Sequence, residues 1–80
     1  MKVGQFELDE KGVLSGPAAY MKEQGTAKLD RILAGNDAGF NAMTAVRPDI
    51  PVGQMVLVAL QTDYAGWVGM RQMFGAARAR

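Results

Sequence analysis

The sequence predicts a small α+β domain, and three observations lead to this prediction. An N-terminal stretch combines strand-like alternation with turn residues, a central stretch has apolar residues at helical spacing, and a C-terminal stretch has a broad apolar helical face. A chain of 80 residues has the length of one domain, 1–80. We expect an N-terminal β-hairpin and a third strand at about 54–61, covered by a central helical segment and a C-terminal helix.

The N-terminal residues predict the hairpin. Residues 5–8 alternate polar and apolar side chains, as in a half-buried strand. Residues 9–12 contain the turn formers Asp9 and Gly12, and residues 13–14 begin the return strand. A hairpin alone is barely stable, so it needs a further strand or a covering helix.

Helix is predicted for the centre of the chain. Ser15 or Gly16 can cap a helix that begins at Pro17, and the apolar residues of its second half share one face: Leu29, Ile32 and Leu33. Gly25 is a possible stop inside this segment, so two short helices and one kinked helix both fit. A further one or two helical turns are expected at 40–46, and the two prolines of 47–51 break the chain there.

The run from 52 to 61 is the most apolar part of the chain. Its periodicity does not separate a strand buried on both faces from a buried helix. We assign it as a strand because the hairpin needs a partner. The alternative is a mostly helical small domain in which 51–61 form a buried helix.

The C-terminal helix is predicted from about Tyr64 to Arg78, with Thr62 or Asp63 as its cap. Its apolar face is broad: Tyr64, Trp67, Val68, Met70, Met73, Phe74 and Ala77. Three glycines lie inside it, and each costs about 1 kcal/mol relative to alanine: Gly66, Gly69 and Gly75. They predict either close packing of another backbone or a short, kinked helix.

Catalytic residue types are scarce. The chain has no cysteine and no histidine, which excludes disulfides, a Cys/His zinc site and a Ser–His–acid triad. Ser15 is the only serine. We therefore expect no enzyme activity, no catalytic residue, no metal, no cofactor and no small-molecule ligand.

Charge disfavours two further classes of partner. The formal net charge of +1 disfavours nucleic acid as the main partner. Residues 50–70 approach the length of a membrane span, but Asp63 near their centre makes insertion costly, so no membrane partner is expected. The absence of cysteine fits a reducing compartment, and we expect the protein to be cytoplasmic.

What remains is binding to protein. The sequence predicts a non-catalytic protein–protein interaction module, such as a regulatory or inhibitory accessory protein of the phage or mobile-element type that docks on a larger protein. One alternative is a structural subunit of a homo-oligomeric or virion-type assembly, and another is a weak nucleic-acid binder that uses the acid-free C-terminal helix. The expected partner-binding residues lie on that helix: Arg71, Arg78, Tyr64 and Trp67.

Overall fold

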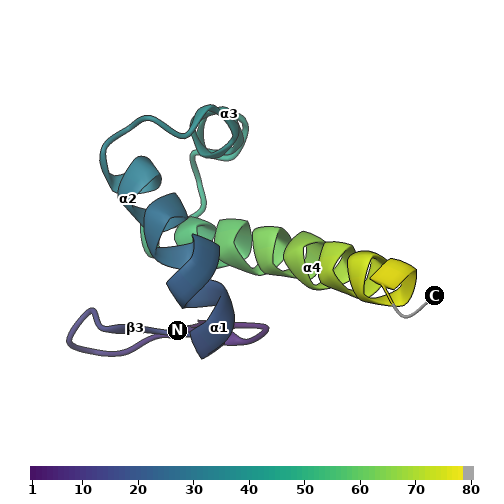
Figure 1. The fold of residues 1–80 in the computed structure, drawn as a ribbon. Coiled ribbons are helices and arrows are strands. Elements are labelled where there is room, and N and C mark those ends of the chain that lie inside the picture. Colours follow the sequence, from purple (N-terminus) through teal and green to yellow (C-terminus); the bar gives the residue numbers. More distant parts are fainter. Residues whose placement is uncertain (79–80) are drawn as a thin grey trace.

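The computed structural model describes the backbone of residues 1–78 and the side chains of residues 1–74. The elements follow in the order β1 (Lys2–Val3), β2 (Phe6–Leu8), β3 (Leu14–Ser15), α1 (Ala18–Tyr20), η1 (Met21–Gly25), α2 (Thr26–Leu33), α3 (Ala38–Val46) and α4 (Val52–Arg78). A small sheet lies at one end, α3 lies at the other, and α4 extends away from both (Figure 1). The predicted α+β class is confirmed.

The sheet is antiparallel, in the order β1-β2-β3. The predicted hairpin is its β2–β3 part, with Leu8 paired to Leu14. Its turn is formed as expected, because the Asp9 carboxylate accepts hydrogen bonds from the backbone of Lys11 and Val13, and Gly12 has a φ of 82°. The third strand is β1, which pairs Val3 with Phe6.

The predicted third strand at 54–61 is wrong, because these residues belong to α4. This half of α4 is buried on two faces, since Leu57 and Leu60 pack on the sheet side and Met55 and Ala59 pack on the α3 side. A helix covered on both faces is apolar almost all round and lacks the usual amphipathic pattern. The two-residue β1 is too short to show alternation, so the sheet's real third strand left no signal.

The predicted helix start at Thr62 or Asp63 is also wrong, since α4 runs through both. The Thr62 hydroxyl donates to the carbonyl of Val58 one turn earlier, and the Asp63 carboxylate accepts a bond from Tyr20. The predicted C-terminal helix is therefore the second half of a helix of 27 residues that begins just after Pro51.

The central helices form one continuous segment, α1–η1–α2, so Gly25 is not a stop. A Cβ at Gly25 would lie 2.6 Å from Met21 Sδ and 2.7 Å from Tyr20 Cε2, so packing requires glycine there. Ser15 lies in β3, and Pro17 precedes α1 without a side-chain capping bond, which corrects the expected Ser15 cap.

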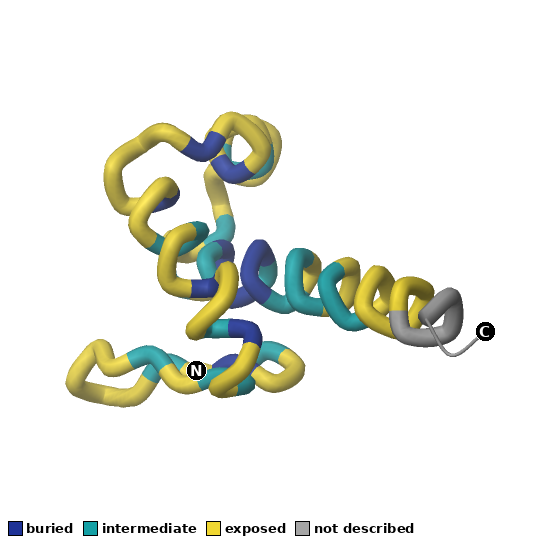
Figure 2. Tube along the Cα trace, in the orientation of Figure 1, coloured by how far each residue is buried: buried dark blue, intermediate teal, exposed yellow. Residues whose placement is uncertain are grey.

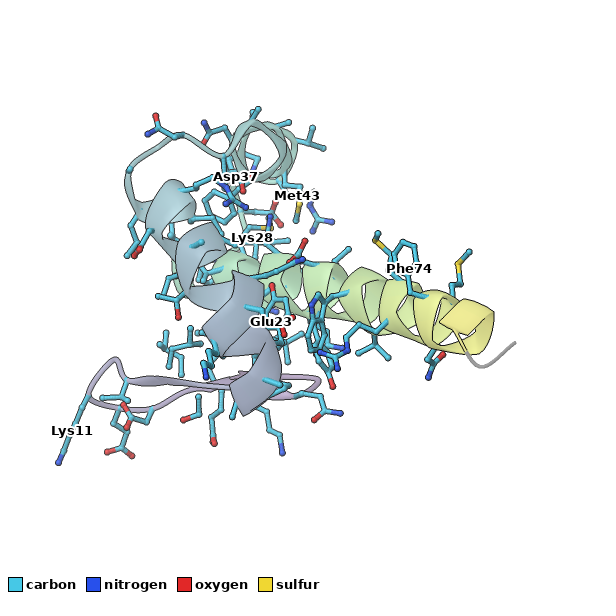
Figure 3. The ribbon with its side chains drawn as sticks, in the orientation of Figure 1. Lys11, Glu23, Lys28, Asp37, Met43 and Phe74 are labelled. Atoms are coloured by element: carbon cyan, nitrogen blue, oxygen red, sulfur yellow. The ribbon has the colours of Figure 1, made fainter. Side chains whose placement is uncertain are left out.

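The break at 47–51 is confirmed, and α3 precedes it. Asp37 is the N-cap of α3 and accepts a 2.9 Å bond from the backbone N–H of Phe40. Lys28 Nζ on α2 lies 3.1 Å from the other oxygen of the same carboxylate, with both side chains largely buried. Asp37 therefore ties α2 to the start of α3 (Figure 3).

The core consists of two clusters on two faces of the first half of α4. One contains Phe6, Tyr20, Leu57 and Leu60, and the other contains Ile32, Phe40, Met55 and Ala59. Burial is concentrated there, while the far end of α4 is exposed (Figure 2). The molecule is elongated, with extents of 47 × 26 × 20 Å, because α4 projects beyond the packed part.

Candidate functional site

The second half of α4 carries the candidate site. We name residues 64–78 the α4 arm; at a rise of about 1.5 Å per residue the arm spans roughly 22 Å. Among the side chains that the structure describes here, the large exposed apolar ones are Met70, Met73 and Phe74, with 58%, 74% and 59% of their surface accessible. Together with Gly66 they form what we name the arm face.

The arm face continues the face that α3 covers in the first half of α4. Met73 follows Met55 by about five full helical turns, so both point to the same side of the helix. Met55 is buried in the cluster with Phe40 of α3, whereas Met73 lies beyond the reach of that cluster. Figure 3 shows Phe74 on the side of α4 toward which α3 lies. One helical face is thus filled by α3 near its start and exposed near its end.

The glycines of the arm do not approach another backbone. A Cβ built at Gly66 or at Gly69 would meet nothing within 4 Å among the described residues, in contrast to Gly25. The prediction of close backbone packing at these two glycines is therefore wrong within this chain. Each of them leaves a smooth, open stretch of helix surface that another helix could approach closely.

The predicted binding aromatics lie toward the sheet side of the arm: Tyr64 is about 180° from Met73, and Trp67, seven residues before Phe74, lies beside the edge of the arm face that Phe74 forms. Tyr64 and Trp67 are half-buried, and their ring centroids lie 5.4 and 5.6 Å from that of the buried Tyr20. Tyr64 also meets Phe6 edge to face, at 5.9 Å. These rings extend the sheet-side core along α4, which gives them a packing role.

Arg71 is the predicted binding residue that joins this aromatic face. Its guanidinium carbon lies 4.8 Å from the Trp67 ring centroid, and its Nη1 lies 3.6 Å from Oε1 of Glu23. Trp67 Nε1 donates to the other oxygen of Glu23, at 3.2 Å. A change of Arg71 to Glu would bring two carboxylates together here, so it would disturb the contact between η1 and α4. Arg78 ends α4, and its side chain lies outside the described residues.

The sequence predicted one broad apolar face that holds Met70, Met73 and Phe74 together with Tyr64 and Trp67, and it did not separate these two groups. The width of the predicted apolar face is the feature of the sequence that could have separated them. Tyr64 and Met73 are about 180° apart around the helix, which is more than one flat surface can cover. Such a width indicates two contact surfaces.

A second apolar surface lies between α3 and the first half of α4. It is an open groove of about 400 Å³ lined by Ala42, Met43, Val46, Arg47, Ile50, Met55 and Val58. Arg47 Nε and Nη2 each donate a 3.1 Å bond to the Asp49 carboxylate, and this contact lowers the pKa of Asp49. The groove therefore offers apolar contact, and its charged group is already paired.

The polar groups near the core are bonded to one another. The Tyr20 hydroxyl donates a 2.6 Å hydrogen bond to the Asp63 carboxylate. Burial is the main reason why the pKa of Tyr20 is raised, and this hydrogen bond is the second reason. The pKa of Asp37 is lowered mainly by the hydrogen bond from the backbone N–H of Phe40, and also by the hydrogen bond from the Lys28 side chain. A cavity of about 180 Å³ lies beside Lys28, Asp37 and Asp63. The carboxylates of Asp37 and Asp63 therefore already have hydrogen-bond partners within the chain, which gives both a structural role.

Neither a metal-binding cluster nor a membrane-spanning helix is found in the part of the chain that the structure describes. Among the described residues, no group of three or more His, Cys, Asp or Glu side chains could hold a metal ion. Nor does any helix within the described part of the chain combine the length and the apolar character required to cross a membrane. Comparison with protein-family models, with curated proteins and with solved structures finds no match to the chain.

Proposed function

We propose that this protein is a non-catalytic protein-interaction module that binds its partner through the arm face of α4. One observation carries the proposal: Met70, Met73 and Phe74 are more than half exposed on a helix whose other half is closely packed. Exposed methionine and aromatic side chains on one helical face are typical of helix-mediated recognition.

The stability of the arm supports the same conclusion. The arm has 15 residues and contains Gly66, Gly69 and Gly75, each of which weakens a helix by about 1 kcal/mol relative to alanine. A separate helix of this length is marginal even with good helix formers. Trp67 and Arg71 hold its near end to η1, so the far end gains most from a partner.

The arm is less suited to binding nucleic acid than to binding protein. Arg71 already lies against Glu23 and Trp67, and the two stacking candidates, Tyr64 and Trp67, are packed on Tyr20.

If the partner is a larger protein, the module is a regulatory or inhibitory accessory protein. We place it in the cytoplasm, because a cysteine-free chain suits a reducing compartment.

The proposal is tested by a photo-crosslinking residue at position 73, with position 33 as the matched control. Met73 and Leu33 have the same exposed fraction, 74%, but Leu33 lies at the end of α2, away from the arm. We expect protein crosslinks from position 73 in expressing cells and few from position 33.

The crosslinked protein is then purified and its affinity measured. Met73→Asp should weaken binding at least about tenfold, a typical loss for a residue central to an interface, while Leu33→Asp should leave it unchanged. Absence of crosslinks at position 73, or an affinity that Met73→Asp does not alter, would contradict the proposal.

A further inference from the structure

The surface of the chain is larger than its mass requires. It exposes 5596 Å², whereas a compact monomer of 8.6 kDa exposes roughly 4,700 Å². The excess of about 900 Å² is close to the roughly 800 Å² that each partner buries in an interface of standard size. The molecule is elongated, and the described far end of α4 is among its exposed parts (Figure 2).

The charge of the arm narrows the choice of partner. Between Asp63 and Arg78 the only charged residue is Arg71, whose guanidinium is already held against Glu23 and the Trp67 ring. The arm face is therefore uncharged and has nothing that would select a partner of opposite charge. Two such faces can meet without like-charge repulsion.

The spacing of the arm face suits a helix pair. Gly66, Met70 and Met73 are separated by four and then three residues, which is the spacing of a seam between two helices. Met73 and Phe74 follow Gly66 by about two turns. In an antiparallel pair centred near Met70, these large side chains lie opposite Gly66 of the other copy, where a Cβ has no neighbour.

We propose that the partner of the arm is a second copy of this chain, and that the two arms pair antiparallel through their arm faces in a two-fold dimer. This inference rests on the proposed function, because it names the partner of the same surface. An antiparallel pair also sets the helix dipoles in opposite directions. Two-fold dimers are the commonest closed assembly of identical chains, since the same surface serves both subunits.

The first test is sedimentation equilibrium of the full chain over concentrations from about 1 to 100 µM, the range in which a modest dimer dissociates. We expect a concentration-dependent dimer. Met73→Asp should raise its dissociation constant at least about tenfold, and Leu33→Asp should leave it unchanged. A dimer that responds equally to both changes would overturn the proposal.

The second test uses the absence of natural cysteine, which makes an introduced thiol unique. Gly66→Cys and Phe74→Cys chains are mixed and oxidised. The antiparallel pair predicts a disulfide between the two different chains, with little self-linking of either variant alone. Preferential self-linking of each variant indicates a parallel pair and overturns the arrangement.

The outcomes separate the two proposals. A chain that is monomeric at every concentration overturns the dimer. If position 73 then crosslinks to another protein, the protein-interaction function stands with a different partner. If it crosslinks to nothing, both proposals fail.

Discussion

The two halves of α4 have similar apolar content but opposite surroundings. In the first half, Leu57 and Leu60 are fully buried and Met55 is nearly so. In the second half, Met70 and Met73 are exposed. The difference arises from what lies beside the helix, because α3 and the sheet cover the first half and neither reaches the far end of the arm. Apolar content alone therefore does not distinguish a core from a contact surface.

The largest expected effect comes from truncating one buried and one exposed side chain of the same helix. Leu57→Ala should lower the free energy of unfolding by about 2–5 kcal/mol, because it opens a cavity in the sheet-side core. Met73→Ala should change it by less than about 0.5 kcal/mol at concentrations where the chain is monomeric. Urea unfolding measures both values, and similar losses would show that the arm is packed within the monomer.

A smaller loss is expected where the buried half of the helix meets the arm. Tyr20→Phe removes the hydroxyl that donates to Asp63, a bond to a charged group worth about 1.5–3 kcal/mol. Asp63→Asn on each background completes a double-mutant cycle by urea unfolding. A coupling energy near zero would mean that the two side chains act independently.

The next largest loss of stability is expected when Asp37, which ties α3 to α2, is replaced. Asp37→Ala should cost about 0.5–2 kcal/mol, because it removes the N-cap of α3. Asp37→Asn keeps an acceptor for Phe40 N–H but loses the charge beside Lys28, so its smaller cost isolates the ion pair.

This contribution depends on pH. The pKa of Asp37 is lower in the folded chain than in the unfolded one, so its stabilisation is complete above the unfolded value of about 3.9. It declines as the pH falls below that value and through the folded pKa. Urea unfolding at several pH values should show this decline in the wild type and less of it in Asp37→Asn. Identical profiles would rule out a contribution from the charge.

The smallest effect has the opposite sign. In the Met73→Asp background, Gly66→Ala should stabilise the arm by up to about 1 kcal/mol, because alanine favours helix and its Cβ meets open space. Gly25→Ala is the matched control and should destabilise, since its Cβ would collide with Tyr20 and Met21. Circular dichroism follows both changes, and a loss of helix in Gly66→Ala would show that the glycine is needed within the monomer.

The sequence predicted those elements whose local chemistry is strong. Asp9 and Gly12 marked the hairpin turn, and Pro48 and Pro51 marked the break before α4. The strand assigned to 54–61 failed for a physical reason. A helix buried on two faces shows no amphipathic period, so its pattern resembles that of a buried strand.

The sequence predicted the helix that carries the candidate site, and the partner-binding residues predicted on that helix stay a prediction. The C-terminal helix was correctly singled out as a helix, but the residues chosen on it, Tyr64, Trp67 and Arg71, face Tyr20 and Glu23. Which face of a helix meets the core depends on the path of the chain around it. Periodicity gives the relative angles of Trp67 and Met73 and does not say which of them is covered.

The position of Trp67 has a practical consequence. It is the only tryptophan of the chain, and it lies where the arm leaves η1, with its ring against Tyr20 and its N–H bonded to Glu23. Its fluorescence therefore arises from a single place, the contact between η1 and the arm. The chain thus carries a built-in optical reporter, with which loss of the contact between the arm and η1 can be followed by fluorescence.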